Sequence, residues 1–159
     1  MKLELIQPFI NAADAVLGHS LGCQTRISDI TMRPERYLRH GAAAVVNMRG
    51  EIEGRIIFDL EHPAADRIAA TLSGTSQPQD SVEEIICELA NQVVGNAVTT
   101  LNDQGFRFKV QPPQVHREAC GSGITEDTEA LVMSFETPSG CLFMNIALRY
   151  KRAGVAAAD

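Results

Sequence analysis

The segment from Ser81 to Asn102 constrains the fold most, because its apolar residues recur at the spacing of one long amphipathic α-helix. At about 100° per residue, these apolar residues gather within roughly a third of the helix circumference. They are Val82, Ile85, Ile86, Leu89 and Val93. The opposite side carries a stripe formed by Glu84, Glu88, Asn91, Gly95 and Asn102. The segment is therefore predicted to turn one face to a core and to present the other.

Two residues of this polar stripe are poor choices for the interior of a helix. The amide of Asn91 competes for backbone hydrogen bonds, and Gly95 costs about 1 kcal/mol relative to alanine. Gly95 lies one turn after Asn91 and removes a side chain there, so another molecule could approach Glu88 and Asn91 closely. This pattern makes the stripe the candidate functional site. The alternative interpretation is an ordinary solvated helix face.

The composition indicates a globular protein and excludes several classes of partner. The chain has 159 residues, of which 45% are hydrophobic and 21% charged, enough to fill the core of one domain. A net charge of −6 argues against nucleic-acid binding, which normally requires clustered lysine and arginine. The sequence contains no apolar run long enough to span a bilayer, and its acidic start lacks the features of a signal peptide. We expect a cytoplasmic protein that binds neither nucleic acid nor membrane.

The cysteines and histidines do not predict a metal site or a nucleophile. The four cysteines lie far apart and show no zinc-ligand spacing with the four histidines. Cys87 is next to Glu88 in sequence but about 100° away around the helix, so we expect a partly buried thiol. The only sequence comparable to a nucleophile elbow, Gly121-Ser122-Gly123, falls in a polar segment. The sequence also contains no phosphate-binding glycine loop followed by lysine.

The N-terminal half predicts a helix, a hairpin and a second helix. Apolar residues at helical spacing predict a first helix that begins at Pro8 and stops at Gly18 or Gly22. The alternation between Thr25 and Met32 is weak. Residues 42–48 and 52–60 are apolar and β-branched, and the turn Arg49-Gly50-Glu51 predicts that they form an antiparallel hairpin. A short helix is predicted from Pro63 to Leu72.

The C-terminal half predicts the long helix followed by further strands. Residues 106–110 are predicted to form a strand that Pro112-Pro113 stops, with a brief resumption at Val115. Residues 130–136 and 141–150 form a second alternating pair. We therefore predict an α+β fold, an antiparallel β-sheet with long helices packed on one face, built from pseudo-duplicated halves. Residues 1–152 would form a single domain, and residues 153–159 a flexible tail.

Several motifs along the chain are familiar in combination. They are residues 1–13 with Pro8-Phe9-Ile10, the hairpin residues 49–54 with Ile56-Ile57-Phe58, Glu88-Leu89-Ala90-Asn91 with Gly95, and Pro112-Pro113. Together they resemble the CheC/CheX family of chemotaxis phosphatases, and the CheX branch most, over most of the chain. The resemblance implies a CheC/CheX-like fold and hydrolysis of the aspartyl phosphate on a CheY-type response regulator in chemotaxis or two-component signalling.

The resemblance also implies roles for the residues of the stripe. Glu88 and Asn91 would enter the active site of the regulator as the catalytic pair. The amide of Asn91 can orient a water molecule, while Glu88 can pair with the regulator's active-site lysine. Glu84 would extend the partner contact by one turn, although a glutamate near a helix start also suits the macrodipole, and Gly95 would clear the approach. The chain would need no cofactor of its own, because the Mg²⁺ belongs to the regulator.

The resemblance further implies a homodimer, for which the strand-rich C-terminal half would supply sheet edges. Some relatives carry a second motif on the first helix. Here Asn11 is present but Pro8 replaces its acidic partner, so we predict one site per chain. Two alternatives stay open: a non-catalytic CheX-like module that binds or sequesters a regulator, and a structural dimerisation domain with an inert helix face.

Overall fold

The computed structural model describes residues 3–34, 41–74, 82–116 and 129–151. The predicted tail at 153–159, the domain end at 152, the helix start at Ser81 and the Gly121-Ser122-Gly123 segment lie outside these ranges. The elements are α1 (Leu3–Leu21), β1 (Arg26–Pro34), β2 (Ala42–Gly50), β3 (Ile52–Leu60), α2 (His62–Ser73), α3 (Val82–Asp103), β4 (Phe108–Val110), β5 (Gln114–His116), β6 (Glu129–Thr137) and β7 (Gly140–Tyr150). The predicted α+β class is confirmed.

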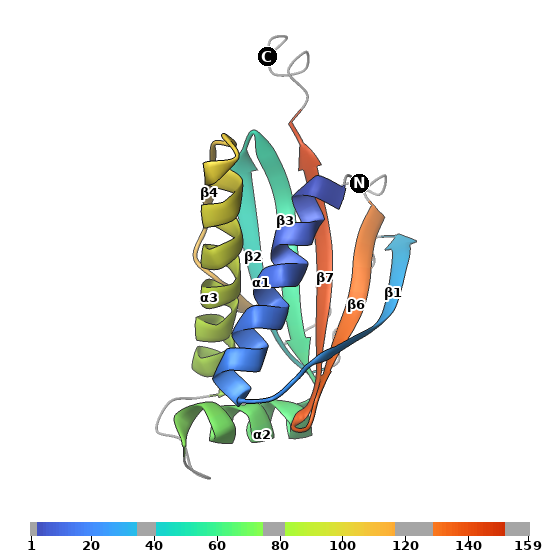
Figure 1. Cartoon of the computed structure of the whole chain (residues 1–159), viewed down its shortest axis with the longest axis vertical. Coiled ribbons are helices and arrows are strands. Elements are labelled where there is room, and N and C mark those ends of the chain that lie inside the picture. The colour runs from blue at the N-terminus through green and yellow to red at the C-terminus, as the bar shows by residue number, and fades with distance from the viewer. Residues whose placement is uncertain (1–2, 35–40, 75–81, 117–128, 152–159) are drawn as a thin grey trace.

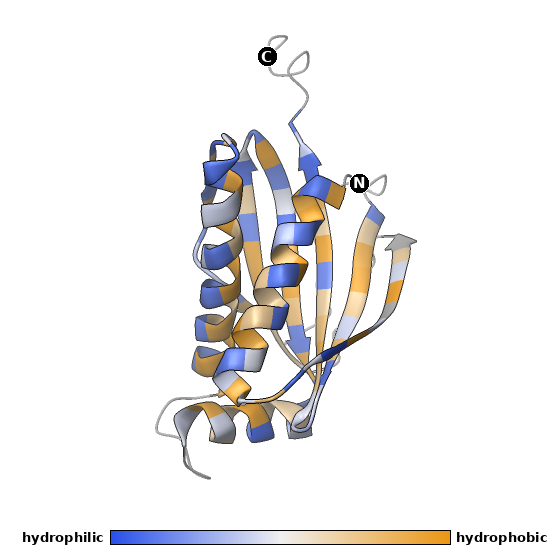
Figure 2. Cartoon of the chain, in the orientation of Figure 1, coloured by the Kyte–Doolittle hydropathy of each residue, from blue (hydrophilic) through white to orange (hydrophobic). Residues whose placement is uncertain are grey.

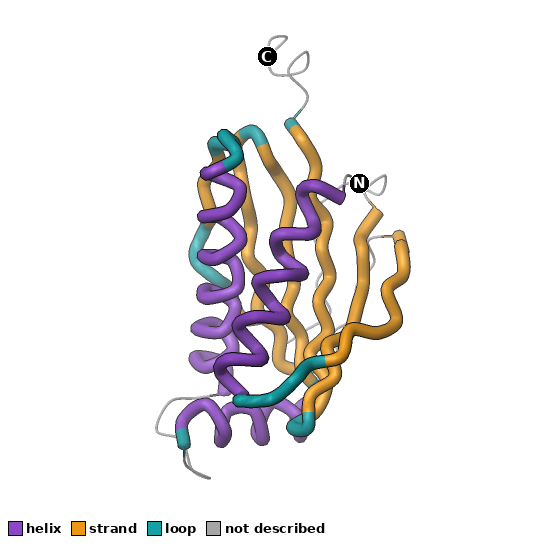
Figure 3. The backbone as a smooth tube through the Cα atoms, in the orientation of Figure 1, coloured by secondary structure: helices purple, strands orange, loops and turns teal. Residues whose placement is uncertain are grey.

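The described strands form one antiparallel sheet of seven strands in the order β1-β6-β7-β3-β2-β4, with β5 also paired to β2. Both predicted hairpins, β2-β3 and β6-β7, are present. If β1 is exchanged with β4, β2 with β6 and β3 with β7, this order becomes its own reverse. The two halves of the chain therefore have the same topology, as the predicted pseudo-duplication requires. Helices α1 and α3 cover one face of the sheet, and α2 lies across one end (Figures 1 and 3).

The core lies between the sheet and the two long helices. Strand residues at every second position point toward the helices, as the period of a strand requires. Buried side chains on this face include Ala44, Val46, Ile56, Phe58, Met144 and Ile146, which cluster with Phe9, Leu17, Leu89 and Val93 of the helices. Hydrophobic and hydrophilic residues alternate turn by turn along α1 and α3 (Figure 2). Full burial of each large apolar side chain is worth about 1.5–3 kcal/mol, so α3 is anchored along its length.

The predicted start of the first helix is wrong. Helix α1 begins at Leu3, and Pro8 lies inside it. A proline there leaves the carbonyl of Glu4 without its usual i+4 donor, which normally disfavours a helix. Leu5 and Ile6 are nevertheless 1% and 3% exposed on the same face as Phe9. Burial of this extra turn offsets the missing hydrogen bond.

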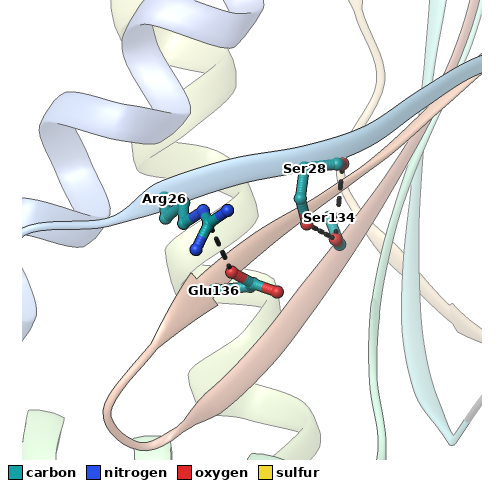
Figure 4. A network of polar contacts seen from close by, with 4 residues as sticks. All are labelled: Arg26, Ser28, Ser134 and Glu136. Atoms are coloured by element: carbon teal, nitrogen blue, oxygen red, sulfur yellow. Dashed lines mark hydrogen bonds and ion pairs between the residues drawn. The ribbon is translucent and has the colours of Figure 1, made fainter.

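Strand β1 is held to β6 at one edge of the sheet (Figure 4). The hydroxyl oxygens of Ser28 and Ser134 are 2.8 Å apart, which satisfies the buried Ser134 side chain. Arg26 and Glu136 form an exposed ion pair at 3.7 Å, a geometry that contributes little stability. In the described sheet β6 and β7 are interior strands, so the edges that its described C-terminal half supplies come from the short β4 and β5. β4 begins at Phe108, two residues later than predicted.

Candidate active site

Helix α3 presents the predicted stripe to the outside. All five stripe residues, Glu84, Glu88, Asn91, Gly95 and Asn102, are exposed. The buried residues of α3 are Ile86, Leu89, Ala90, Val93, Val94, Ala97 and Leu101. Val82 and Ile85, which we expected in the centre of the apolar face, are only half-buried because that face is centred closer to Ala90 and Ala97.

The surroundings of two glycines show why Gly95 is unusual. A Cβ atom added to Gly54 would lie 1.9 Å from the carbonyl oxygen of Ala147, so close packing of two strands requires a glycine there. A Cβ atom added to Gly95 would meet nothing within 4 Å. Nothing in the described fold requires glycine at position 95, and alanine would be more favourable in a helix by about 1 kcal/mol. The choice of glycine therefore has no explanation in the packing of the described residues.

Asn91 and Glu88 differ in their own contacts. The Asn91 side chain makes no hydrogen bond to another described residue, so its amide can donate to and accept from water or a partner. The Oε1 of Glu88 accepts a long hydrogen bond of 3.4 Å from the Nε2 of Gln92. Gln92 did not figure in the sequence-based site, although its position four residues after Glu88 places both on one helix face.

Glu84 lies at the start of α3, together with Glu83 in the first turn. Carboxylates there interact favourably with the partial positive charge of the helix N-terminus. This contact is the structural alternative to a partner-binding role. Glu84 and Glu88 nevertheless line one depression, so their carboxylates share a surface.

The corresponding region of α1 carries only half of a motif. The Oδ1 of Asn11 accepts a hydrogen bond of 2.8 Å from the Nε2 of Gln7, and Pro8 stands where an acidic residue would be required. Asn11 lines a groove between α1 and α3 whose other polar residues include Asn96, Thr100 and Gln104. One site per chain remains the prediction.

Cys87 is half-buried, as predicted. Burial, and then the nearby Glu83 carboxylate, raises the pKa of its thiol above the ordinary value. Because the thiolate is the reactive form, Cys87 is not set up as a nucleophile at neutral pH.

Cys87 is expected to react with iodoacetamide at pH 7 more slowly than an ordinary thiol, and its rate should continue to rise with pH beyond the point where that of an ordinary thiol levels off. Mass spectrometry of the Cys87 peptide against pH, with N-acetylcysteine as the reference thiol, measures this rate. A Cys87→Ala variant should keep all activity of the site. Labelling faster than the reference at pH 7 would contradict the assignment.

The described residues contain no group of three or more His, Cys, Asp or Glu side chains that could hold a metal ion. None of the described helices combines the length and the apolar character needed to cross a membrane.

Solved structures of known proteins share this fold. A CheC-like superfamily protein from Shewanella sp. PV-4 has a TM-score of 0.81 at 20% identity over 94% of this chain and 99% of its own. Chemotaxis protein CheX from Vibrio vulnificus has a TM-score of 0.78 at 19% identity over 92% and 99%. CheX of Borrelia burgdorferi, solved in a complex with CheY, BeF3 and Mg²⁺, has a TM-score of 0.69 at 29% identity over 93% and 99%.

The fold is thus the one that CheC-like proteins have. No curated protein sequence matches the chain significantly. A family model described as chemotaxis phosphatase CheX matches residues 42–136, which include the hairpin β2-β3 and all of α3. The chain belongs to the CheX family of chemotaxis phosphatases.

Proposed function

We propose that this chain hydrolyses the aspartyl phosphate of a CheY-type response regulator in chemotaxis or two-component signalling. The exposed stripe of Glu88, Asn91 and Gly95 on α3 carries the proposal, because it joins an amide, a carboxylate and a cleared approach on one rigid helix. Membership of the CheX family supports it, as does the complex of Borrelia burgdorferi CheX with CheY, BeF3 and Mg²⁺.

Asn91 would orient the attacking water. In the reaction, the water oxygen bonds to phosphorus while the bond from phosphorus to the aspartyl oxygen breaks, giving a free carboxylate and inorganic phosphate. An acyl phosphate is already activated, so alignment of this water and compensation of charge are the main requirements. An amide can hold water without changing its own protonation state.

Glu88 and Glu84 would bind the regulator. A carboxylate would repel the phosphoryl group, so Glu88 is better suited to pair with the active-site lysine of the regulator. Glu84, one turn earlier, would extend this acidic contact. The Mg²⁺ that neutralises the phosphoryl group would be bound by the regulator, and this chain would need no cofactor of its own.

The expected homodimer is part of the same proposal. Strand β1 is an edge strand in the described sheet, and it exposes Ile30 and Met32 by 54% and 45%. An edge strand with exposed large apolar side chains suits pairing across a two-fold axis. Sedimentation equilibrium measures the mass of the assembly, and a monomer at micromolar concentration would contradict a stable dimer.

The primary test follows the decay of an acyl phosphate. A CheY-type regulator is phosphorylated with acetyl phosphate, freed of excess donor, and incubated with and without this chain. Faster release of inorganic phosphate supports a phosphatase. Tight binding of the regulator without faster release, across a panel of regulators, would instead identify the binding module.

Gly95 offers an independent prediction. Gly95→Ala should raise the free energy of unfolding by about 0.5–1 kcal/mol, because the added methyl group meets open space. Gly95→Leu should keep the helix but weaken regulator binding about tenfold by steric clash. Urea denaturation and titration calorimetry measure the two effects. Unchanged affinity in Gly95→Leu would show that the partner does not approach this turn.

A further inference from the structure

Beside the stripe, the ends of two helices and the first half of a third enclose a depression of about 870 Å³. Its residues are His19 and Ser20 from α1, Leu72 and Ser73 from α2, and Glu84, Ile85, Glu88, Leu89 and Gln92 from α3. We call it the three-helix groove. Glu88 belongs both to the groove and to the proposed catalytic stripe, so the groove continues directly from the site.

The three-helix groove has an apolar floor and a polar rim. Leu72 and Ile85 are half-buried and provide apolar surface inside the depression, and Leu89, which is 2% exposed, closes its base. Glu84, Glu88 and Gln92 are exposed at its border. Such a surface suits a side chain with an apolar stem and a polar head, in the way lysine and arginine cover apolar surface with their methylene groups.

The charged groups around the groove favour a positively charged ligand. Among the described residues that line the groove, two are carboxylates and only His19 is basic in type. The groove is also lined by the last residues of α1 and α2, and the C-terminal end of a helix carries partial negative charge. Glu83 and Glu84 offset the opposite partial charge at the start of α3.

We propose that the three-helix groove receives a lysine or arginine side chain of the response regulator, separate from the active-site lysine assigned to Glu88. The stem would lie on Leu72 and Ile85, and the head would approach Glu84. This inference rests on the proposed function for the identity of the partner. The groove would then determine specificity. It would favour regulators whose surface carries a basic residue that reaches the groove while Glu88 and Asn91 occupy the active site.

The structure supplies a matched pair of positions for the test. Ser73 lines the groove, whereas Thr71 on the same turn of α2 does not. Both residues are exposed, and their hydroxyls donate to the carbonyl oxygens four residues earlier, Ala69 and Arg67, at 2.8 and 2.9 Å. Equal substitutions at the two positions therefore change the net charge alike, and each removes a hydroxyl bond to the preceding turn. Ser73, the last residue of α2, also donates a weaker bond of 3.3 Å to the carbonyl of Ala70.

Ser73→Lys should raise the Kd for a BeF3-bound CheY-type regulator, and the KM for its phosphorylated form, about fivefold with kcat unchanged. Ser73→Asp should lower both constants about twofold. Thr71→Lys and Thr71→Asp should leave them at the wild-type values. Binding is measured by titration calorimetry, and turnover by phosphate release.

Equal effects at positions 71 and 73, or the same direction of change for lysine and aspartate, would overturn the groove assignment while the proposed function stands. If the Ser73 variants, without a regulator, formed an assembly of different mass from the wild-type chain, the groove would be assigned to self-association. That result would also overturn the groove assignment. A wild-type chain that neither binds nor dephosphorylates any regulator of a panel would overturn both proposals.

Discussion

Replacement of Asn91 by alanine is expected to lower kcat for regulator dephosphorylation at least about 100-fold, because misplacement of a reacting water by 1 Å already has an effect of that size. The fold should be unaffected, since Asn91 is exposed and alanine is the better helix former. Binding of the BeF3-bound regulator should also persist, because Glu88, not Asn91, is proposed to bind the regulator. Phosphate release in single turnover and titration calorimetry separate the two effects.

Asn96→Ala is the matched control for this prediction. Asn96 is also exposed on α3, but it lies about 140° around the helix from Asn91 and lines the groove toward α1. It should keep the wild-type kcat. If Asn91→Ala retained more than half of the wild-type rate, the water-orienting role would be wrong, and a loss in both variants would indicate a general effect on the helix.

The character of α3 was predictable because one local pattern determines it. A helix period fixes which residues share a face, so the exposure of Glu88, Asn91 and Gly95 followed from spacing alone. The hairpins were predictable for a similar reason, since alternation and turn residues are both local. The catalytic roles remain predictions, because exposure on one face does not show what binds there.

The three-helix groove could not be predicted from the sequence. Ser20, Leu72 and Glu84 come from three helices, and only tertiary packing brings them together. The predicted start of α1 was wrong for a related reason. The local rule for Pro8 favoured a helix start, but burial of Leu5 and Ile6 against the sheet outweighed it.

Glu88→Lys is expected to raise the Kd for the BeF3-bound regulator about 100-fold, because it replaces an attraction to the active-site lysine with a like-charge contact. The fold should persist, since Glu88 is exposed and its bond of 3.4 Å to Gln92 is weak. Asp103→Lys makes the same charge change about 22 Å further along α3 and should leave the Kd nearly unchanged.

The salt dependence of these affinities separates a direct ion pair from long-range attraction. Exposed charges that act at a distance lose most of their effect once the Debye length is about 3 Å, at 1 M salt. The difference between Glu88→Lys and Asp103→Lys should therefore survive at high salt, because Glu88 would meet its lysine at contact. If Glu88→Lys bound the regulator like the wild type, the pairing proposal would fail. If both variants weakened binding equally and salt removed the effect, Glu88 would contribute only to the overall negative field.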